Sequence, residues 1–201
     1  MVEYHVPSAK EFKEAGRREF AFLQSDFEFK ESKAPFKYEN PYSIFFRHKN
    51  TFVYVEGLSY GFSLGVDIGT LGFFGKVKER FSLGYVVGLR RPDLLEPRFP
   101  EKRGQIEEMK RAAFDLKECA NDFLNGDFSA LHDVLRYYKK LQEKSHSEYE
   151  AAEQKRIGIQ ASEAFHSIDY KKCIDLLSPI EKQLSKAQRI MLSQSRKRLH
   201  R

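Results

Sequence analysis

The sequence contains no tryptophan, only two cysteines, and no apolar run close to the roughly 18 residues that a membrane-spanning helix needs. Its N-terminus has neither the basic start nor the apolar core of a signal peptide, so we expect a cytoplasmic protein with no membrane partner. Neither Cys119 and Cys173 nor the six histidines have the spacing of a zinc site. We therefore expect no metal, no cofactor, and two buried thiols in a reducing compartment.

Signatures of nucleophilic catalysis and nucleotide binding are also missing. There is no Gly-x-Ser-x-Gly turn and no cysteine–histidine signature. The glycines between residues 57 and 75 fit neither a phosphate-binding loop nor a dinucleotide fingerprint. Glu56 and Asp67, on adjacent predicted strands, are the remaining candidates for general acid–base chemistry. More often, two carboxylates on adjacent strands are simply charges on the solvent face of a sheet.

The first half of the chain has the pattern of an α+β domain. Ser8 and Glu11 form a capping-box pattern, which predicts a helix that starts after Ser8 and ends near Ser25. Strict alternation of apolar and small or polar residues predicts a strand over 61–69, and the same alternation recurs over 83–89. We therefore predict an N-terminal helix on a meander of about four antiparallel strands, in a domain spanning residues 1–100.

The second half has helical periodicity. Three prolines between residues 92 and 100 predict a linker over 90–100. After Gly104 the apolar period changes from two to 3.6, and we expect helices near 147–166, 169–178 and 185–199. Residues 101–201 are thus predicted to form an all-α helical-hairpin domain.

Residues 119–128 resemble residues 161–170, at an offset of 42. Each segment has an aromatic residue, a short turn with Asp, and another aromatic residue that starts a new helix. This arrangement is typical of αα-hairpin repeats, and the second copy partly resembles a tetratricopeptide hairpin. Such repeats usually bind other macromolecules.

All of the net charge of +6 lies near the C-terminus. Residues 180–201 contain seven Lys and Arg against one Glu, whereas the rest of the chain has 28 charges of each sign. Arg189, Arg196, Lys197 and Arg198 are therefore the candidates for contacts with nucleic-acid phosphates. The alternative is that these cations stabilise the end of a helix and keep it solvated. No aromatic residue that could stack on a base lies within 180–201.

Four segments, 52–56, 59–69, 92–95 and 164–180, together with the basic run 196–198, resemble an uncharacterised bacterial family of small cytoplasmic proteins. In make-up, such proteins are similar to immunity and antitoxin proteins, which act by binding a partner. Gly61 stands where the family pattern has an acidic residue, so a role for that acid does not carry over. The resemblance implies no assigned reaction.

The favoured function is therefore non-catalytic protein–protein binding in the bacterial cytoplasm. A partner would contact either a concave helical surface or the polar face of the sheet, where Ser63, Asp67 and, if the strands pair, Arg47 are the candidate residues. The alternatives are nucleic-acid binding through the basic C-terminal helix and, more weakly, an enzyme built on Glu56 and Asp67.

Overall fold

A computed structural model of the chain describes residues 6–36, 40–58, 63–94 and 104–199. The chain forms two compact units, Met1–Tyr138 and Lys139–Arg201. The first combines helices with an antiparallel sheet, and the second is helical. The predicted α+β class, with an N-terminal helix, a meander and a C-terminal helical part, is confirmed.

The first unit is built on a five-stranded sheet with the strands in the order β1-β2-β3-β4-β5, every neighbour antiparallel. The strands are β1 (Lys30–Ser32), β2 (Ser43–His48), β3 (Thr51–Leu58), β4 (Ser63–Leu71) and β5 (Val77–Ser82). The helical segments of this unit are α1 (Ala9–Glu19), α2 (Phe22–Ser25), η2 (Phe73–Gly75), α3 (Leu83–Arg90), η3 (Pro92–Leu94), α4 (Gln105–Cys119) and α5 (Asn121–Leu124).

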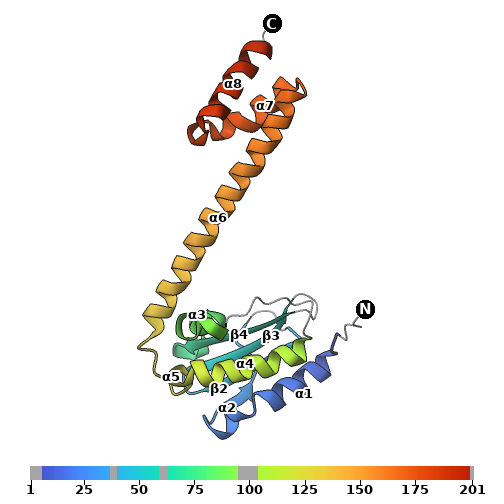
Figure 1. Ribbon diagram of the computed structural model, residues 1–201. Helices are drawn as coiled ribbons and strands as arrows, with labels where there is room; N and C mark the ends of the chain where they lie inside the picture. The colour runs from blue at the N-terminus through green and yellow to red at the C-terminus, as the bar shows by residue number, and fades with distance from the viewer. Residues whose placement is uncertain (1–5, 37–39, 59–62, 95–103, 200–201) are drawn as a thin grey trace. The chain divides into compact units, whose positions relative to one another are not determined.

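The two faces of the sheet have different environments. One face packs against α1, α3 and α4 and carries Ile44, Val53 and Ile68 into the main core (Figure 1). Because successive strand residues point to opposite faces, their neighbours form a second, smaller apolar cluster on the other face. That cluster consists of Phe45, Phe52, Tyr54 and Leu71, with Ala34, Phe36 and Val77 packed against it. We call it the second-face cluster.

The predicted start of the first helix is confirmed. The Glu11 backbone N–H donates to Ser8 Oγ at 3.3 Å, and the Ser8 N–H donates to Glu11 Oε2 at 2.7 Å, which completes a capping box. The helix α1 ends at Glu19, and the short α2 continues to Ser25, where the sequence pattern had placed the end of one helix. Phe12 and Phe20 are fully buried.

The prediction of a strand over 83–89 is wrong, because these residues form helix α3. The Gly84 N–H donates to Ser82 Oγ at 3.2 Å, so Ser82 caps a helix at the point where strand β5 ends. Leu83, Val86 and Val87 are buried, which is helical spacing and not alternation. The other predicted strand is found as β4, which begins at Ser63, whereas Gly61 and Phe62 lie outside the described residues.

The boundary between the compact units does not coincide with the change of period near residue 101. Met109 and Leu116 of α4 are fully buried in the same core as Phe12. The change of period therefore marks a change of secondary structure, while packing against the sheet continues beyond it. Of the predicted linker, Arg90 ends α3 and Pro92–Leu94 forms η3, and residues 95–100 lie outside the described part.

The second unit contains residues 139–166 of α6 (Leu131–His166), then α7 (Tyr170–Leu177), η5 (Ser178–Gln183) and α8 (Lys186–Leu199). The helix predicted near 147–166 is the C-terminal part of a longer helix, α6, which already begins at Leu131. The core of the unit consists of Ala161, Ala164, Cys173, Leu177, Leu184 and Leu192. Cys173 here and Cys119 in the first unit are both buried free thiols, as predicted.

The similarity between residues 119–128 and 161–170 corresponds to two turns of the same construction. Gly126 (φ 83°) and Ile168 (φ 66°) are both left-handed, and each is followed by an aspartate. The Asp127 carboxylate accepts the Ser129 N–H at 2.9 Å, and the Asp169 carboxylate accepts the Lys172 N–H at 3.1 Å. The turns belong to different compact units, so the similarity describes a local motif in each.

Candidate functional site

The sheet face that carries the second-face cluster brings together only part of the predicted protein-binding site. Ser63 and Asp67 lie on β4, and Arg47 lies on β2, two strands away. The strand register aligns Arg47 with Phe52 and Gly69, and Asp67 with Tyr54, so Arg47 and Asp67 are offset in both directions of the sheet. Arg47 Nε donates instead to the Lys49 carbonyl at 2.9 Å. The expected grouping of Arg47 with Asp67 is therefore not formed.

Asp67 pairs with Arg80, a residue of β5 that the sequence pattern did not single out. Arg80 Nε lies 2.6 Å from Asp67 Oδ2, and its Nη2 lies 3.8 Å from Glu56 Oε2. The guanidinium carbon lies 4.9 Å from the centre of the Phe36 ring and 5.1 Å from that of Tyr54. Arg80 thus covers the second-face cluster and joins it to two carboxylates.

The electrostatics of this cluster favour a structural role. Burial raises the pKa of the Asp67 carboxyl, and the Arg80 charge and hydrogen bond oppose that rise. Burial likewise raises the pKa of the Tyr54 hydroxyl. Glu56 Oε1 accepts a hydrogen bond from Asn40 Nδ2 at 3.0 Å, so its carboxylate is held between Asn40 and Arg80. Both carboxylates of the acid–base hypothesis therefore contact the same arginine, Arg80.

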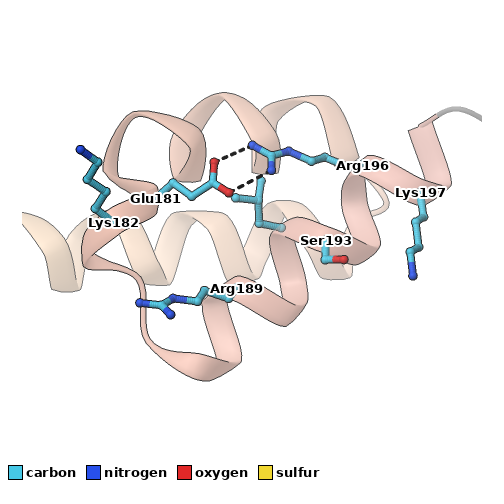
Figure 2. Close-up of a pocket in the computed structure, with 7 residues that line it drawn as sticks. Glu181, Lys182, Arg189, Ser193, Arg196 and Lys197 are labelled. Atoms are coloured by element: carbon cyan, nitrogen blue, oxygen red, sulfur yellow. Dashed lines mark hydrogen bonds and ion pairs between the residues drawn. The ribbon is translucent and has the colours of Figure 1, made fainter.

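The second unit contains a pocket of about 690 Å³ formed by η5 and α8 (Figure 2). Its lining residues are Glu181, Lys182, Arg189, Leu192, Ser193, Arg196 and Lys197. Three of the four predicted nucleic-acid contacts are among them, together with Lys182, which the sequence pattern had included only in a charge count. The pocket is strongly cationic, with four basic side chains and one carboxylate.

Helical spacing explains why these residues meet. Those that α8 contributes recur every three or four positions and so share one face of the helix, namely Arg189, Leu192, Ser193, Arg196 and Lys197. The helix begins after Ser185, whose Oγ accepts the Gln188 N–H at 3.3 Å while Gln188 Oε1 accepts the Ser185 N–H at 2.8 Å. Leu192 itself is buried against the core of the unit and anchors that face. This spacing is a signal from which the pocket could have been predicted.

The cations of the pocket have different contacts. Arg196 donates to both carboxylate oxygens of Glu181, at 3.1 and 2.8 Å, and this hydrogen bonding lowers the pKa of Glu181. Arg189 Nε donates to the Leu184 carbonyl at 3.0 Å. Lys182, Arg189 and Lys197 point away from the Glu181–Arg196 pair (Figure 2). Glu181 is the one carboxylate among the described lining residues, and its ion pair is with Arg196 and not with Lys182, Arg189 or Lys197.

Arg198, the fourth predicted contact, is not part of this pocket. Its guanidinium carbon lies 5.5 Å from the centre of the Phe165 ring and 5.4 Å from that of Tyr170, and its Nη1 donates to Tyr170 Oη at 2.8 Å. It lies one position after Lys197, and one residue rotates an α-helix by about 100°. The basic run therefore divides into a pocket-lining part and a part that packs on the α6–α7 turn.

Within the described residues, no group of three or more His, Cys, Asp or Glu side chains has an arrangement that could hold a metal ion. None of the helices in that part of the chain combines the length and apolarity that crossing a membrane requires. Comparison of the chain with known proteins found no matching family model, no matching curated protein and no matching solved structure.

Proposed function

We propose that this protein is a non-catalytic protein-binding module, and that the pocket between η5 and α8 holds an acidic segment of its partner. The observation that carries the proposal is the composition of that pocket. Its described lining has four basic side chains and one carboxylate, Glu181, which is ion-paired with Arg196. Electrostatic complementarity of this kind selects partners and accelerates their encounter. The packing of α7 against α8 as a helical hairpin is also found in proteins that bind other macromolecules.

The chemistry of the lining favours an acidic peptide over a nucleic acid. Leu192 and the stems of the basic side chains offer apolar contact next to the charges, which suits a peptide with mixed carboxylate and apolar side chains. No aromatic ring lines the pocket, so bases would find no stacking surface there. Phe165 and Tyr170 belong to the same unit but do not line the pocket, and Arg198 already covers both of their rings.

In biological terms, we propose a bacterial cytoplasmic protein of the immunity or antitoxin type. Support comes from the resemblance of segments 52–56, 59–69, 92–95 and 164–180 to an uncharacterised bacterial family of small cytoplasmic proteins, since some bacterial proteins of this size and make-up act as immunity or antitoxin partners. In this role the protein would act by occupying a surface of its partner, with steric exclusion and charge pairing as the mechanism. No step of that mechanism needs a chemical reaction.

Nucleic-acid binding is a second candidate, favoured by one observation. Arg189 and Lys197, two of the predicted phosphate contacts, line one pocket with Lys182, and none of these three is paired with a carboxylate of the lining. Three phosphate contacts would give an affinity that falls as salt rises, with a log–log slope of about −2 to −3. The Glu56–Asp67 enzyme hypothesis gains no comparable support, because Arg80 engages both carboxylates.

The two candidates are separated by fluorescence anisotropy with two labelled probes of equal length, a poly-glutamate peptide and a poly-thymidine oligonucleotide. We expect the peptide to bind more tightly, and the double variant Arg189→Glu/Lys197→Glu to lose that binding. The matched control is Lys155→Glu/Lys171→Glu, which makes the same charge change at exposed positions of the same unit outside the pocket. Its binding should stay close to that of the unmodified protein.

Tighter binding of the oligonucleotide, lost in the pocket variant alone, would favour nucleic-acid binding. Equal loss in both variants would show that only net charge matters, and the pocket proposal would then be wrong. Native co-purification provides the cellular counterpart: a protein partner at a fixed ratio should be recovered with the unmodified chain and with the control, and not with the pocket variant.

A further inference from the structure

The hairpin that joins β4 to β5 exposes two adjacent aromatic side chains. Phe73 is 90% exposed and Phe74 is 95% exposed, more than any other large hydrophobic residue of the described chain. Their ring centres are 5.9 Å apart, so the rings contact each other. We call Phe73 and Phe74 the Phe tip. Adjacent exposed aromatic residues of this kind mark an interaction site.

The backbone of the hairpin holds both rings outward. Phe74 has a left-handed conformation (φ 61°, ψ 21°), which is an outlier for a bulky residue, and Gly75 that follows is also left-handed (φ 70°). The neighbouring apolar residues Leu71 and Val77 turn inward onto the second-face cluster. An apolar surface is therefore available next to the hairpin, and yet the strained turn directs the two phenylalanines away from it.

The surroundings of the Phe tip are basic. The Leu71 N–H donates to the Asn50 carbonyl at 2.6 Å, which places the β2–β3 turn beside this hairpin. Residues 47–51 and 70–78 contain Arg47, Lys49, Lys76 and Lys78 and no aspartate or glutamate. All four cations are exposed, and an Arg47 Nη atom lies 3.9 Å from the position that a Cβ on Gly75 would take. A protruding apolar tip is thus bordered by positive charge.

We propose that the Phe tip and its four cations bind the surface of an anionic lipid bilayer. The two rings would enter the boundary between headgroups and acyl chains, and the basic side chains would contact the anionic headgroups. A bilayer suits this shape because it is fluid and accepts a protruding side chain without a preformed pocket. The sequence expectation of no membrane partner rests on the absence of an apolar run, which bears on spanning and not on surface binding.

The first test is co-sedimentation of the full-length protein with vesicles of phosphatidylcholine, with and without phosphatidylserine. We expect binding to the anionic vesicles only, and a drop of roughly 30-fold in affinity for Lys76→Gln/Lys78→Gln. Phe73→Ser/Phe74→Ser should abolish binding. The matched control is Phe114→Ser on α4, a half-exposed phenylalanine of the same unit, which should bind like the unmodified protein.

The absence of tryptophan provides a second, independent readout. Phe74→Trp creates a single fluorophore at the tip, and its emission should shift to the blue and be quenched by brominated lipid when anionic vesicles are added. Phe114→Trp, the corresponding control, should show neither change. Both substitutions replace one exposed aromatic side chain by another, so folding is retained.

Three results would overturn the proposal: no sedimentation with anionic vesicles at low salt, equal sedimentation of Phe73→Ser/Phe74→Ser, or a Phe74→Trp emission that the vesicles leave unchanged. Equal binding to neutral vesicles would overturn the role of the four cations. A dimer in light scattering that Phe73→Ser/Phe74→Ser dissociates, without vesicle binding, would assign the Phe tip to contact between copies of this chain. The proposal does not rest on the pocket of the second unit, so either can fail alone.

Discussion

The turns at Gly126 and Ile168 are built from the same parts but serve different surroundings. In each, an aromatic pair brackets the left-handed residue, with ring centres 5.3 Å apart for Phe123–Phe128 and 5.8 Å for Phe165–Tyr170. An arginine stacks on each pair: Arg90 lies over the Phe123 ring in the first unit, and Arg198 lies over both Phe165 and Tyr170 in the second.

The two turns differ in burial and in charge pairing. Phe123 is fully buried and also contacts Phe81, whereas Phe165 is only half-buried. Arg90 forms a two-pronged ion pair with Asp122, while Arg198 donates to the neutral hydroxyl of Tyr170. The same local turn is thus part of the core in the first unit and part of the surface in the second. Tertiary context therefore decides what this local motif does.

The largest effect should come from truncating the buried member of the aromatic pairs. Phe123→Ala should lower the free energy of unfolding by about 3–5 kcal/mol, because it leaves a cavity in the main core. Phe165→Ala should cost about 1–2 kcal/mol, since a half-buried ring gives up only part of its transfer free energy. Urea unfolding followed by circular dichroism measures both. Equal losses would mean that the two turns are equally closed and would contradict the comparison.

A smaller difference should separate the two arginine contacts. Burial would raise the pKa of Asp122, but hydrogen bonds, chiefly from Arg90, outweigh it and leave the pKa below its ordinary value. Asp122→Asn should cost about 2 kcal/mol at neutral pH because it removes a charge-assisted pair. Tyr170→Phe should cost about 0.5–1 kcal/mol, since it removes one exposed hydrogen bond to a neutral acceptor.

The Asp122 effect should also depend on pH. Because its pKa is lower in the folded state, the folded protein binds the proton less readily than the unfolded chain. The stability contributed by Asp122 is then fully present above the unfolded value of about 3.9 and is lost as the pH falls through the folded pKa. Unfolding measured from neutral to acid pH should show the gap between Asp122→Asn and the unmodified protein closing. A gap that persists at the acid end would contradict the assignment.

The smallest effect should come from exchanging the left-handed residues. Gly126→Ala should destabilise the first unit by about 1 kcal/mol, since its φ of 83° strains any side chain while the nearest atom to the added Cβ, Thr51 Oγ1, is 3.8 Å away. Ile168→Gly should stabilise the second unit by about 0.5 kcal/mol, because Ile168 is 70% exposed and loses little burial when the strain is removed. Thermal melting resolves shifts of this size. A loss of stability for Ile168→Gly would show that its side chain has a packing role.

Local signals in the sequence predicted the elements that local physics controls. The Ser8–Glu11 capping box and the alternating strand after Ser63 need only neighbouring residues, and the structure contains both. The strand prediction for residues 83–89 was wrong because Leu, Tyr and Val alternating with Gly are compatible with a helix as well as with a strand. The N-cap at Ser82 favours the helix.

The candidate site depended on contacts between distant segments, which a pattern does not contain. Asp67 was predicted, but its partner Arg80 lies on β5, and the sequence pattern did not single out that residue. The cations of α8 were predicted as a run, and their division between pocket and turn follows from helix rotation and from the position of Leu192. The outward direction of the Phe tip required the left-handed backbone at Phe74.

The two buried cysteines give the protein a chemical reporter in each compact unit. Cys119 is 2% exposed and Cys173 is fully shielded, so a thiol reagent can reach either one only when its own unit opens. Burial also raises the pKa of the Cys119 thiol, which slows its reaction further while the unit is closed. Labelling followed by peptide mass analysis would therefore time the opening of each unit separately, in one sample of the unmodified chain.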